Sequence, residues 1–300
     1  MLHFDHFIAI DWSSRAQPSP RKPSRDAIWL AEAPADGKLI TKYFRTRQDC
    51  ASYVEKRLLR LQKADKTVLV GWDFVFGYPA GLGRALKIKK KRPWKDLWRL
   101  LSKLVKDKRD NRNNRFAVGA ELNRRISVGS GPFWGVPAGQ SGIFLGAKKD
   151  FSYPVVNKRA VLAERRVVER RIPKAQPAWK LAYTGSVGSQ ALLGLPRVYD
   201  LCFRHEKLAD YCHVWPYETR FARRLPERPC ALHAEIYPSL LEVDKKDKII
   251  DRAQVRTYVR WLQEEQNAGR LGDWLAGPED LSKQERRAVL REEDWVLGVR

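Results

Sequence analysis

The sequence predicts an α/β fold with a mixed sheet, in which three antiparallel strands come first and parallel strands follow. Two observations indicate this fold: the first part of the chain has the order strand, hairpin, helix, strand, and a further apolar strand follows near residue 230. We expect helices to flank the sheet. We also expect the 300 residues to form one domain, with a basic helical and loop insertion at about residues 80–160.

The N-terminal elements follow from local patterns. We expect strands at residues 7–12, 27–33, 38–44 and 67–73, and a helix at 47–63. Asp36-Gly37 is a favoured hairpin turn and separates the second and third strands. Val54, Leu58 and Leu61 recur at helical spacing. The strand at 67–73 is apolar enough to be central in the sheet.

The rest of the chain is less regular. Residues 84–115 read as a basic amphipathic helix whose apolar positions include Trp94 and Trp98, and residues 127–157 read as a long irregular loop. Further elements are expected as a short helix at 160–171, a glycine-rich turn at 183–188 leading into a helix, an edge strand at 214–216, a core strand at 230–237 and a helix at 252–265. Ser282 and Glu285 form a capping box that opens a final helix.

Composition narrows the class of protein. The formal net charge is +23, from 58 Lys and Arg against 35 Asp and Glu, which favours attraction to polyanions such as nucleic acid. The four cysteines form no Cys-x-x-Cys pair, so we expect reduced, buried thiols rather than a zinc site. There is no signal-peptide pattern and no membrane-spanning apolar run. These features predict a soluble cytoplasmic protein that does not bind membranes, of unknown oligomeric state.

Three carboxylates close strand-like runs. They are Asp11, Asp73 and Glu235. A carboxylate at the tip of a buried strand is costly to keep ionised unless a cation or hydrogen bonds compensate it. Three such tips on one sheet can converge on a divalent metal, and the basic composition makes a nucleic-acid phosphate the expected substrate.

Glu292 is a fourth candidate. It lies in the same narrow arc of the expected final helix as the apolar residues Ala288, Trp295 and Val299. A charge within an apolar stripe indicates that it faces a site. Glu293 is the alternative, because a helix register can shift by one residue.

Several of these motifs together resemble the ribonuclease H-like superfamily, and more closely the predicted-nuclease family catalogued as domain of unknown function 429. The motifs are Ile8–Ser13, Gly71–Phe74, Gly185–Gln190, Ala234–Pro238 and Glu292–Trp295. The resemblance implies a nuclease that hydrolyses phosphodiester bonds with two Mg²⁺ or Mn²⁺ ions, held by Asp11, Asp73, Glu235 and Glu292. The basic segment has no counterpart in the minimal fold.

A phosphate-binding set accompanies the carboxylates. Glycines ahead of a helix can present backbone N–H groups to a phosphate, and neighbouring cations can hold the nucleic-acid backbone. The candidates are Ser13, Lys89, Lys90, Lys91, Arg92, Arg165, Arg166, Lys180, Gly185, Ser186 and Gly188. Alternatively the glycines only cap the helix, Glu169 ties down the arginines, and the tryptophans face the core.

Other interpretations stay open. Asp11 can cap the following turn with Ser13, Glu235 can pair with an arginine, and His233 can be a proton shuttle or a hydrogen-bonded structural residue. The whole protein can be a non-catalytic nucleic-acid-binding protein of the same fold, or a nucleotide or small-phosphate enzyme. Some relatives of the family carry labels that point to molybdopterin or cobalamin biosynthesis, but these residues give no indication of that chemistry.

Overall fold

A seven-stranded mixed sheet forms the centre of the molecule. The computed structural model describes residues 2–300 except 89–90, 128, 184, 227–228 and 245. The strand order is β3-β2-β1-β4-β8-β7, and β9 also pairs with β8. The strands are β1 (His6–Asp11), β2 (Ile28–Pro34), β3 (Ile40–Phe44), β4 (Val68–Asp73), β7 (Cys212–Val214), β8 (Ala231–Ile236) and β9 (Val296–Leu297).

The direction of the strands confirms the predicted mixed sheet. β1 pairs antiparallel with β2, and β2 pairs antiparallel with β3. β1 and β4, β4 and β8, β7 and β8, and β8 and β9 are all parallel pairs. The carboxyl ends of β1, β4 and β8 therefore lie at one edge of the sheet.

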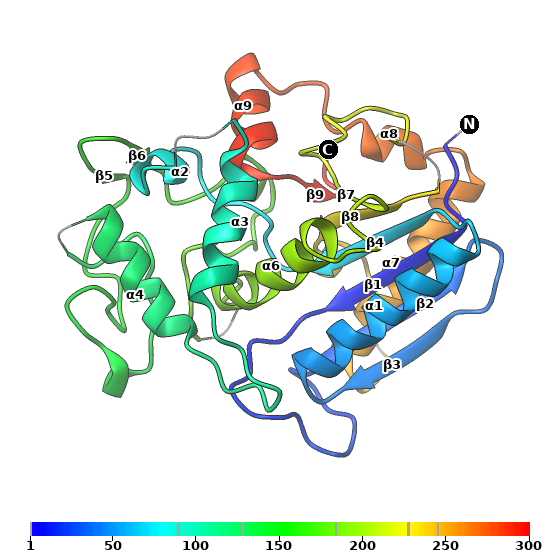
Figure 1. Cartoon of the computed structure of the whole chain (residues 1–300), viewed down its shortest axis with the longest axis horizontal. Coiled ribbons are helices and arrows are strands. Elements are labelled where there is room, and N and C mark those ends of the chain that lie inside the picture. Colours follow the sequence, from blue (N-terminus) through cyan, green and yellow to red (C-terminus); the bar gives the residue numbers. More distant parts are fainter. Residues whose placement is uncertain (1, 89–90, 128, 184, 227–228, 245) are drawn as a thin grey trace.

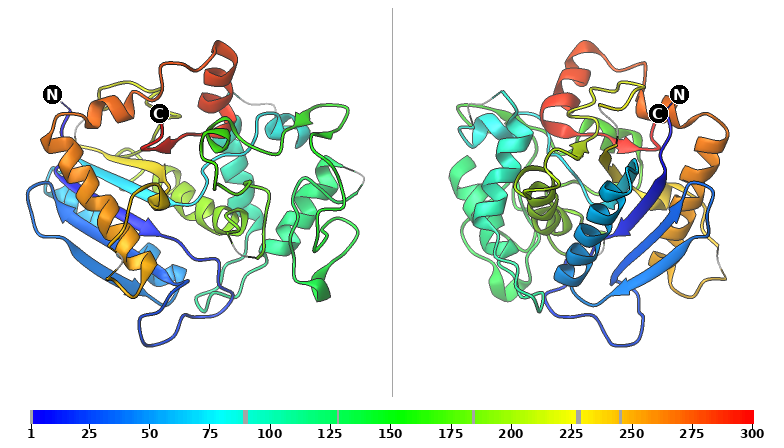
Figure 2. Two further views of the ribbon diagram at one scale, coloured as in Figure 1. Left: turned by 180° about the vertical axis from the view of Figure 1, so that it is seen from behind. Right: turned by 45° about the vertical axis from the view of Figure 1, so that its right-hand side comes forward.

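Helices cover both faces of the sheet (Figures 1 and 2). α1 (Arg47–Lys63) and α6 (Gly188–Phe203) lie on one face, and α7 (Ile250–Asn267) lies on the other. The remaining helices are α2 (Leu82–Ala85), α3 (Pro93–Leu104), α4 (Arg115–Ile126), α5 (Val167–Arg171), α8 (Leu271–Leu275) and α9 (Lys283–Ala288), with 3₁₀ turns at Ala138–Gln140 and Pro238–Leu240. A small hairpin joins β5 (Val155–Val156) to β6 (Val161–Leu162).

The alternation of side chains along β1 divides the core into two layers. Ile8 and Ile10 pack in the cluster on the α1 and α6 side, whereas Phe7 and Ala9 pack in the cluster on the α7 side. Successive residues of a strand point to opposite faces, so Asp11 continues the α7 side. The strand phase thus decides which layer a residue at the strand end joins.

The expected basic helix at 84–115 is wrong in extent. Only Pro93–Leu104 forms a long helix there, and α2 is a separate short turn. Pro93 is the first helical residue, a position that favours proline because the N–H it lacks would have no helical partner there. Trp94 and Trp98 are buried, which confirms the interpretation of both rings as core residues.

The expected long final helix is also wrong. The capping box of Ser282 and Glu285 is confirmed, but α9 ends at Ala288. A single π-helical turn, Val289–Glu293, follows, and Asp294 has φ of 68°, which ends helical structure before β9. The stripe that was to place Glu292 on an apolar helix face therefore does not exist.

Other expectations agree with the structure more closely. Residues 127–157 are mostly irregular, and the expected helix at 160–171 is reduced to α5 because β6 occupies its beginning. All four cysteines are buried, and none of them forms a disulfide in the described chain. Within the described residues, no helix is both long and apolar enough to cross a membrane.

Candidate active site

Asp11 and Asp73 lie side by side at the carboxyl ends of β1 and β4. The two strands are parallel, and these residues are directly paired in the register. Their side chains therefore share one face of the sheet, and both line an open cleft of ≈ 660 Å³. A cleft of this size at the carboxyl ends of parallel strands is a typical position for a ligand site.

Two further aspartates line the same cleft. Asp251 lies in the first turn of α7, and Asp26 precedes β2. The backbone N–H of Asp26 donates to Asp251 Oδ2 at 2.7 Å, which links the two segments. Neither residue was predicted from the sequence. The available signal was an acidic residue in the first turn of a helix that follows the last core strand.

The proximity of these acids changes their proton affinity. Burial and the neighbouring charges of Asp73, Asp251 and Asp26 raise the pKa of Asp11 well above its usual range. Burial, Glu235 and Asp251 raise the pKa of Asp73 to about 8. The site therefore favours a proton or a metal cation over bare carboxylates.

Cationic side chains also line the cleft. They are Arg15, Arg115 and Lys174. Arg115 is half-buried and donates from Nε to Ser189 Oγ at 3.0 Å. Burial and the nearby charge of Arg47 lower the pKa of Arg115 to about 10, and in the described part of the chain Arg115 has no carboxylate partner within ion-pair distance. An anion entering the cleft would supply that missing charge.

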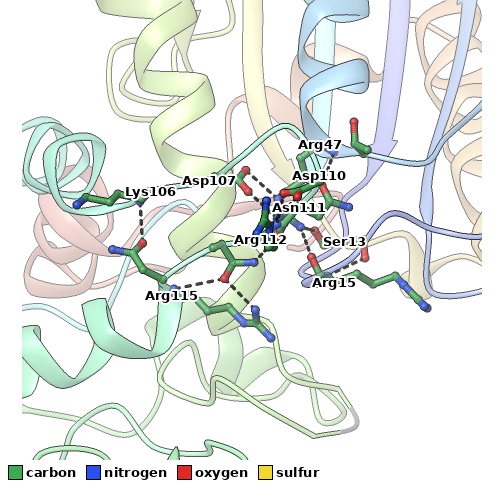
Figure 3. A network of polar contacts seen from close by, with 12 residues as sticks. Ser13, Arg15, Arg47, Lys106, Asp107, Asp110, Asn111, Arg112 and Arg115 are labelled. Atoms are coloured by element: carbon green, nitrogen blue, oxygen red, sulfur yellow. Dashed lines mark hydrogen bonds and ion pairs between the residues drawn. The ribbon is translucent and has the colours of Figure 1, made fainter.

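Arg47 fixes the loop that follows β1 (Figure 3). Its guanidinium is fully buried and donates to the carbonyl oxygens of Ser13 and Arg15 at 3.0 and 2.8 Å. It also pairs with both oxygens of Asp107, at 2.6 and 2.9 Å, and donates to the carbonyl of Asn111. This fork of donors joins the rim of the cleft to the segment between α3 and α4.

The glycine-rich turn borders the cleft, but only some residues of the turn line the cleft. Gly185 and Ser186 line the cleft, as does Ser13 after β1. Gly188 was expected to offer its N–H to a phosphate, but that N–H donates to the Lys180 carbonyl at 3.0 Å. Gly188 is buried, and a side chain at this position would meet the backbone oxygens of residues 178 and 180. It is therefore a packing residue.

Glu235 does not line the cleft, contrary to expectation. β8 pairs with β4 so that Glu235 lies opposite Trp72, not Asp73, and its side chain therefore projects toward the α1 and α6 side. Its two oxygens accept from the guanidinium of Arg166, both at 2.7 Å. This is the arginine pairing that the sequence left open. It occupies the carboxylate that we expected to bind metal.

The same contact corrects the role of Arg166. This residue was expected to contact nucleic acid, but it is 1% exposed and pairs with both Glu235 and Glu169. Arg165 donates to the carbonyl of Ala175 at 2.8 Å, which also directs it away from the cleft. Both arginines therefore hold the fold together.

Glu292 and Glu293 are likewise used inside the fold. The Glu292 carboxylate accepts from the N–H of Gly83 at 2.9 Å, and Glu293 accepts from the N–H groups of Ala80 and Val167. Neither residue lines the cleft. Their backbone-anchoring role accounts for the acidic residues without a metal.

The other expected phosphate contacts lie away from the cleft. Lys180 donates to Gln176 and stands over the ring of Trp134, while Arg92 approaches Glu218 at 3.4 Å on the surface. Lys91 is exposed. Lys89 and Lys90 lie outside the described residues.

A separate cluster joins Cys202, Cys212 and His233. Their potential ligand atoms lie within 4.8 Å of one another, the only such trio of His, Cys, Asp or Glu among the residues described. Trp72 donates from Nε1 to His233 Nδ1 at 3.0 Å, which makes His233 a hydrogen-bonded structural residue. Because indole is only a donor, Nδ1 must keep its lone pair and the neutral ring carries its proton on Nε2. A metal-bound histidine needs the opposite arrangement, so this trio does not fit a metal.

The aspartates of the cleft fit a hard divalent cation better. All four offer carboxylate oxygens, the ligands that Mg²⁺ and Mn²⁺ prefer. Burial and the neighbouring carboxylates raise the pKa of both Asp11 and Asp73, so a bound cation would lower the cost of keeping them ionised. In the described chain, no three of these carboxylates have oxygen atoms within 4.8 Å of one another.

Comparison with protein-family models, curated proteins and solved structures gave no match to this chain.

Proposed function

We propose that this protein is a metal-dependent nuclease. It would hydrolyse phosphodiester bonds in the cleft that Asp11, Asp26, Asp73 and Asp251 line, here called the carboxylate cleft. The observation that carries the proposal is the direct pairing of Asp11 with Asp73 on neighbouring parallel strands. Asp251 and Asp26 complete an oxygen-rich site, and Arg115 and Lys174 supply positive charge in the same cleft. A phosphodiester is a substrate that needs both kinds of group at once.

The strand arrangement supports a ribonuclease H-like fold. Three antiparallel strands followed by parallel ones, with carboxylates at the ends of the first and fourth strands, agree with the resemblance found in the sequence. The proposal changes one ligand. Asp251 of α7 replaces Glu235, because Glu235 faces the other side of the sheet and is bound by Arg166.

In this proposal the acidic residues of the cleft bind metal ions and the basic residues bind phosphates. Asp11 and Asp73, with Asp251 and Asp26, would hold Mg²⁺ or Mn²⁺. When bound, two such ions supply an activated water and stabilise the leaving oxygen. The hydrogen bond to Ser189 holds the Arg115 guanidinium in place, and Arg115 would orient a non-bridging phosphate oxygen. Lys174 and Arg15 are exposed and attract the flanking phosphates.

The test is cleavage of labelled single-stranded, duplex, hybrid and branched nucleic acids in Mg²⁺ or Mn²⁺. Asp73→Asn should abolish metal-dependent cleavage and leave binding intact or tighter. Asp210→Asn is the matched control, because Asp210 is exposed and outside the cleft. Cleavage retained by Asp73→Asn, or by the wild type in EDTA, would refute the mechanism.

A non-catalytic nucleic-acid-binding protein is the second candidate. The net charge of +23 favours it equally. Retarded bands without products, in both metals and with every substrate, would support this function. Absence of both binding and cleavage would direct the search to nucleotides and small phosphates.

A further inference from the structure

Tyr183 is an exposed aromatic residue in the wall of the carboxylate cleft. The residue is one of those that line the cleft, and it is 57% exposed. The other exposed large apolar side chains in the described chain are all aliphatic: Ile40, Ile143, Val156, Val161, Leu240 and Ile250. Among the described residues, Tyr183 is thus the exposed aromatic residue, and it lies at this cleft.

Hydrogen bonds hold both the side chain and the backbone of Tyr183. Its hydroxyl donates to the carbonyl oxygen of Val136 at 2.9 Å, and its own carbonyl accepts from the N–H of Ser186 at 3.0 Å. The backbone φ is 71°, in the left-handed region that a tyrosine adopts only at a cost of about 1–3 kcal/mol. The surrounding contacts thus fix an unfavourable conformation that keeps the ring at the cleft.

The neighbours of Tyr183 suit a nucleotide. Lys174 and Arg115 line the same cleft and provide positive charge for phosphates, and Gly185 and Ser186 lie just beyond the ring in sequence. Proteins that bind single-stranded nucleic acid combine cations for the backbone with aromatic rings for the bases. In a duplex the base faces are already stacked on one another, so this ring has no partner there.

We propose that Tyr183 forms a nucleobase-stacking subsite, so that the cleft takes an unpaired nucleotide of a single strand, flap or frayed end. This inference rests on the proposed function and deepens it, since it names the structural class of the substrate. The hydroxyl contact to Val136 orients the ring, and the ring face binds the base. The subsite reads no sequence, because every base has a π-face.

The experiment measures binding in EDTA, where no cleavage occurs. A fluorescent single-stranded oligonucleotide, an abasic oligonucleotide of the same length and a duplex are titrated by anisotropy. Tyr183→Leu removes the aromatic face and Tyr183→Phe keeps it, so the two variants form a matched pair. Thermal unfolding shows whether each variant is folded.

Stacking predicts a loss of about 10-fold in single-strand affinity for Tyr183→Leu, and a much smaller loss for Tyr183→Phe. The abasic strand should bind the wild type as weakly as it binds Tyr183→Leu, and duplex affinity should be the same in all three proteins. Equal binding of the intact single strand by wild type and Tyr183→Leu would overturn the subsite alone. Failure of the wild type to bind any nucleic acid would overturn the proposed function together with it.

Discussion

Glu235 and Arg166 form a two-point ion pair in the interior, with each carboxylate oxygen 2.7 Å from a guanidinium nitrogen. Arg166 also binds Glu169 and the carbonyl oxygen of Glu293, so one buried cation joins three separate segments. The strand-end carboxylate that most resembles a metal ligand in the sequence is thus a structural residue. The proposed metal ligands are therefore Asp11, Asp73, Asp251 and Asp26, which line the cleft.

Replacing Arg166 by Met should strongly destabilise the fold. The change leaves Glu235 and Glu169 buried without their cation, and breaking a buried pair in this way costs about 3–5 kcal/mol. Chemical denaturation measures the loss. Arg170→Met is the control, because Arg170 reaches Glu285 only at the surface, and little change is expected there. Equal stability of the two variants would contradict the central role of Arg166.

The raised pKa of Asp73 predicts that the free energy of unfolding of the metal-free protein decreases as the pH rises. The pKa of Asp73 is raised from 3.8 to about 8 by burial, Glu235 and Asp251. Between these values the folded state keeps a proton that the unfolded state releases, so the free energy of unfolding falls as the pH rises from about 4 to about 8. Asp11 has a raised pKa as well and acts in the same direction. Thermal unfolding in EDTA across this range tests the trend.

Asp73→Asn should weaken this decline, because the amide has no charge to bury. Its melting temperature at pH 8 in EDTA should exceed that of the wild type. Mg²⁺ should raise the melting temperature of the wild type at pH 8, since it binds the folded state, and should raise that of the variant less. A variant that declines with pH as steeply as the wild type would show that Asp73 is not the responsible group.

The sheet and half of the site were accessible from the sequence because they depend on short-range patterns. The apolar runs and the Asp36-Gly37 turn predicted the antiparallel strands, and the strand ends identified Asp11 and Asp73. Glu235 was misplaced by one register step: it pairs with Trp72, so its side chain leaves the opposite face of the sheet. The distance of a residue from a strand end does not determine its face.

Long-range relationships were not accessible in the same way. Asp251 joins the cleft only because α7 packs against β1 and β2, and no local pattern states that contact. The expected stripe containing Glu292 failed because a π-helical turn and Asp294 end helical structure after Ala288. Similarly, the burial of Arg166 depends on partners from β8 and from the C-terminal segment.

Arg115→Met should weaken nucleic-acid binding without unfolding the protein. Its guanidinium lies in the cleft and has no carboxylate partner in the described structure, so an incoming phosphate is its natural counterion. Losing one phosphate contact should reduce the slope of log affinity against log salt by about 0.7–0.9. Arg109→Met removes the same charge from an exposed position outside the cleft and should change the slope less. The prediction fails where both variants show the same salt dependence.

Arg47→Lys should loosen the loop after β1 even though it keeps the charge. Lysine has three donors on a single nitrogen, whereas Arg47 reaches Asp107 from Nε and Nη2 and the carbonyl oxygens of Ser13 and Arg15 from Nη1 (Figure 3). We expect a loss of about 2 kcal/mol or more in unfolding free energy, because buried carbonyl groups lose their donors.

Hydrogen exchange separates a local effect on this loop from general destabilisation. Peptides covering residues 13–15 should exchange faster in Arg47→Lys than peptides from β1, and cleavage or binding should fall because Ser13 and Arg15 line the cleft. Arg60→Lys, at an exposed position of the same helix, is the matched control and should leave exchange unchanged. Uniform acceleration across the whole sheet would instead mean that Arg47 supports the core and not the rim of the cleft.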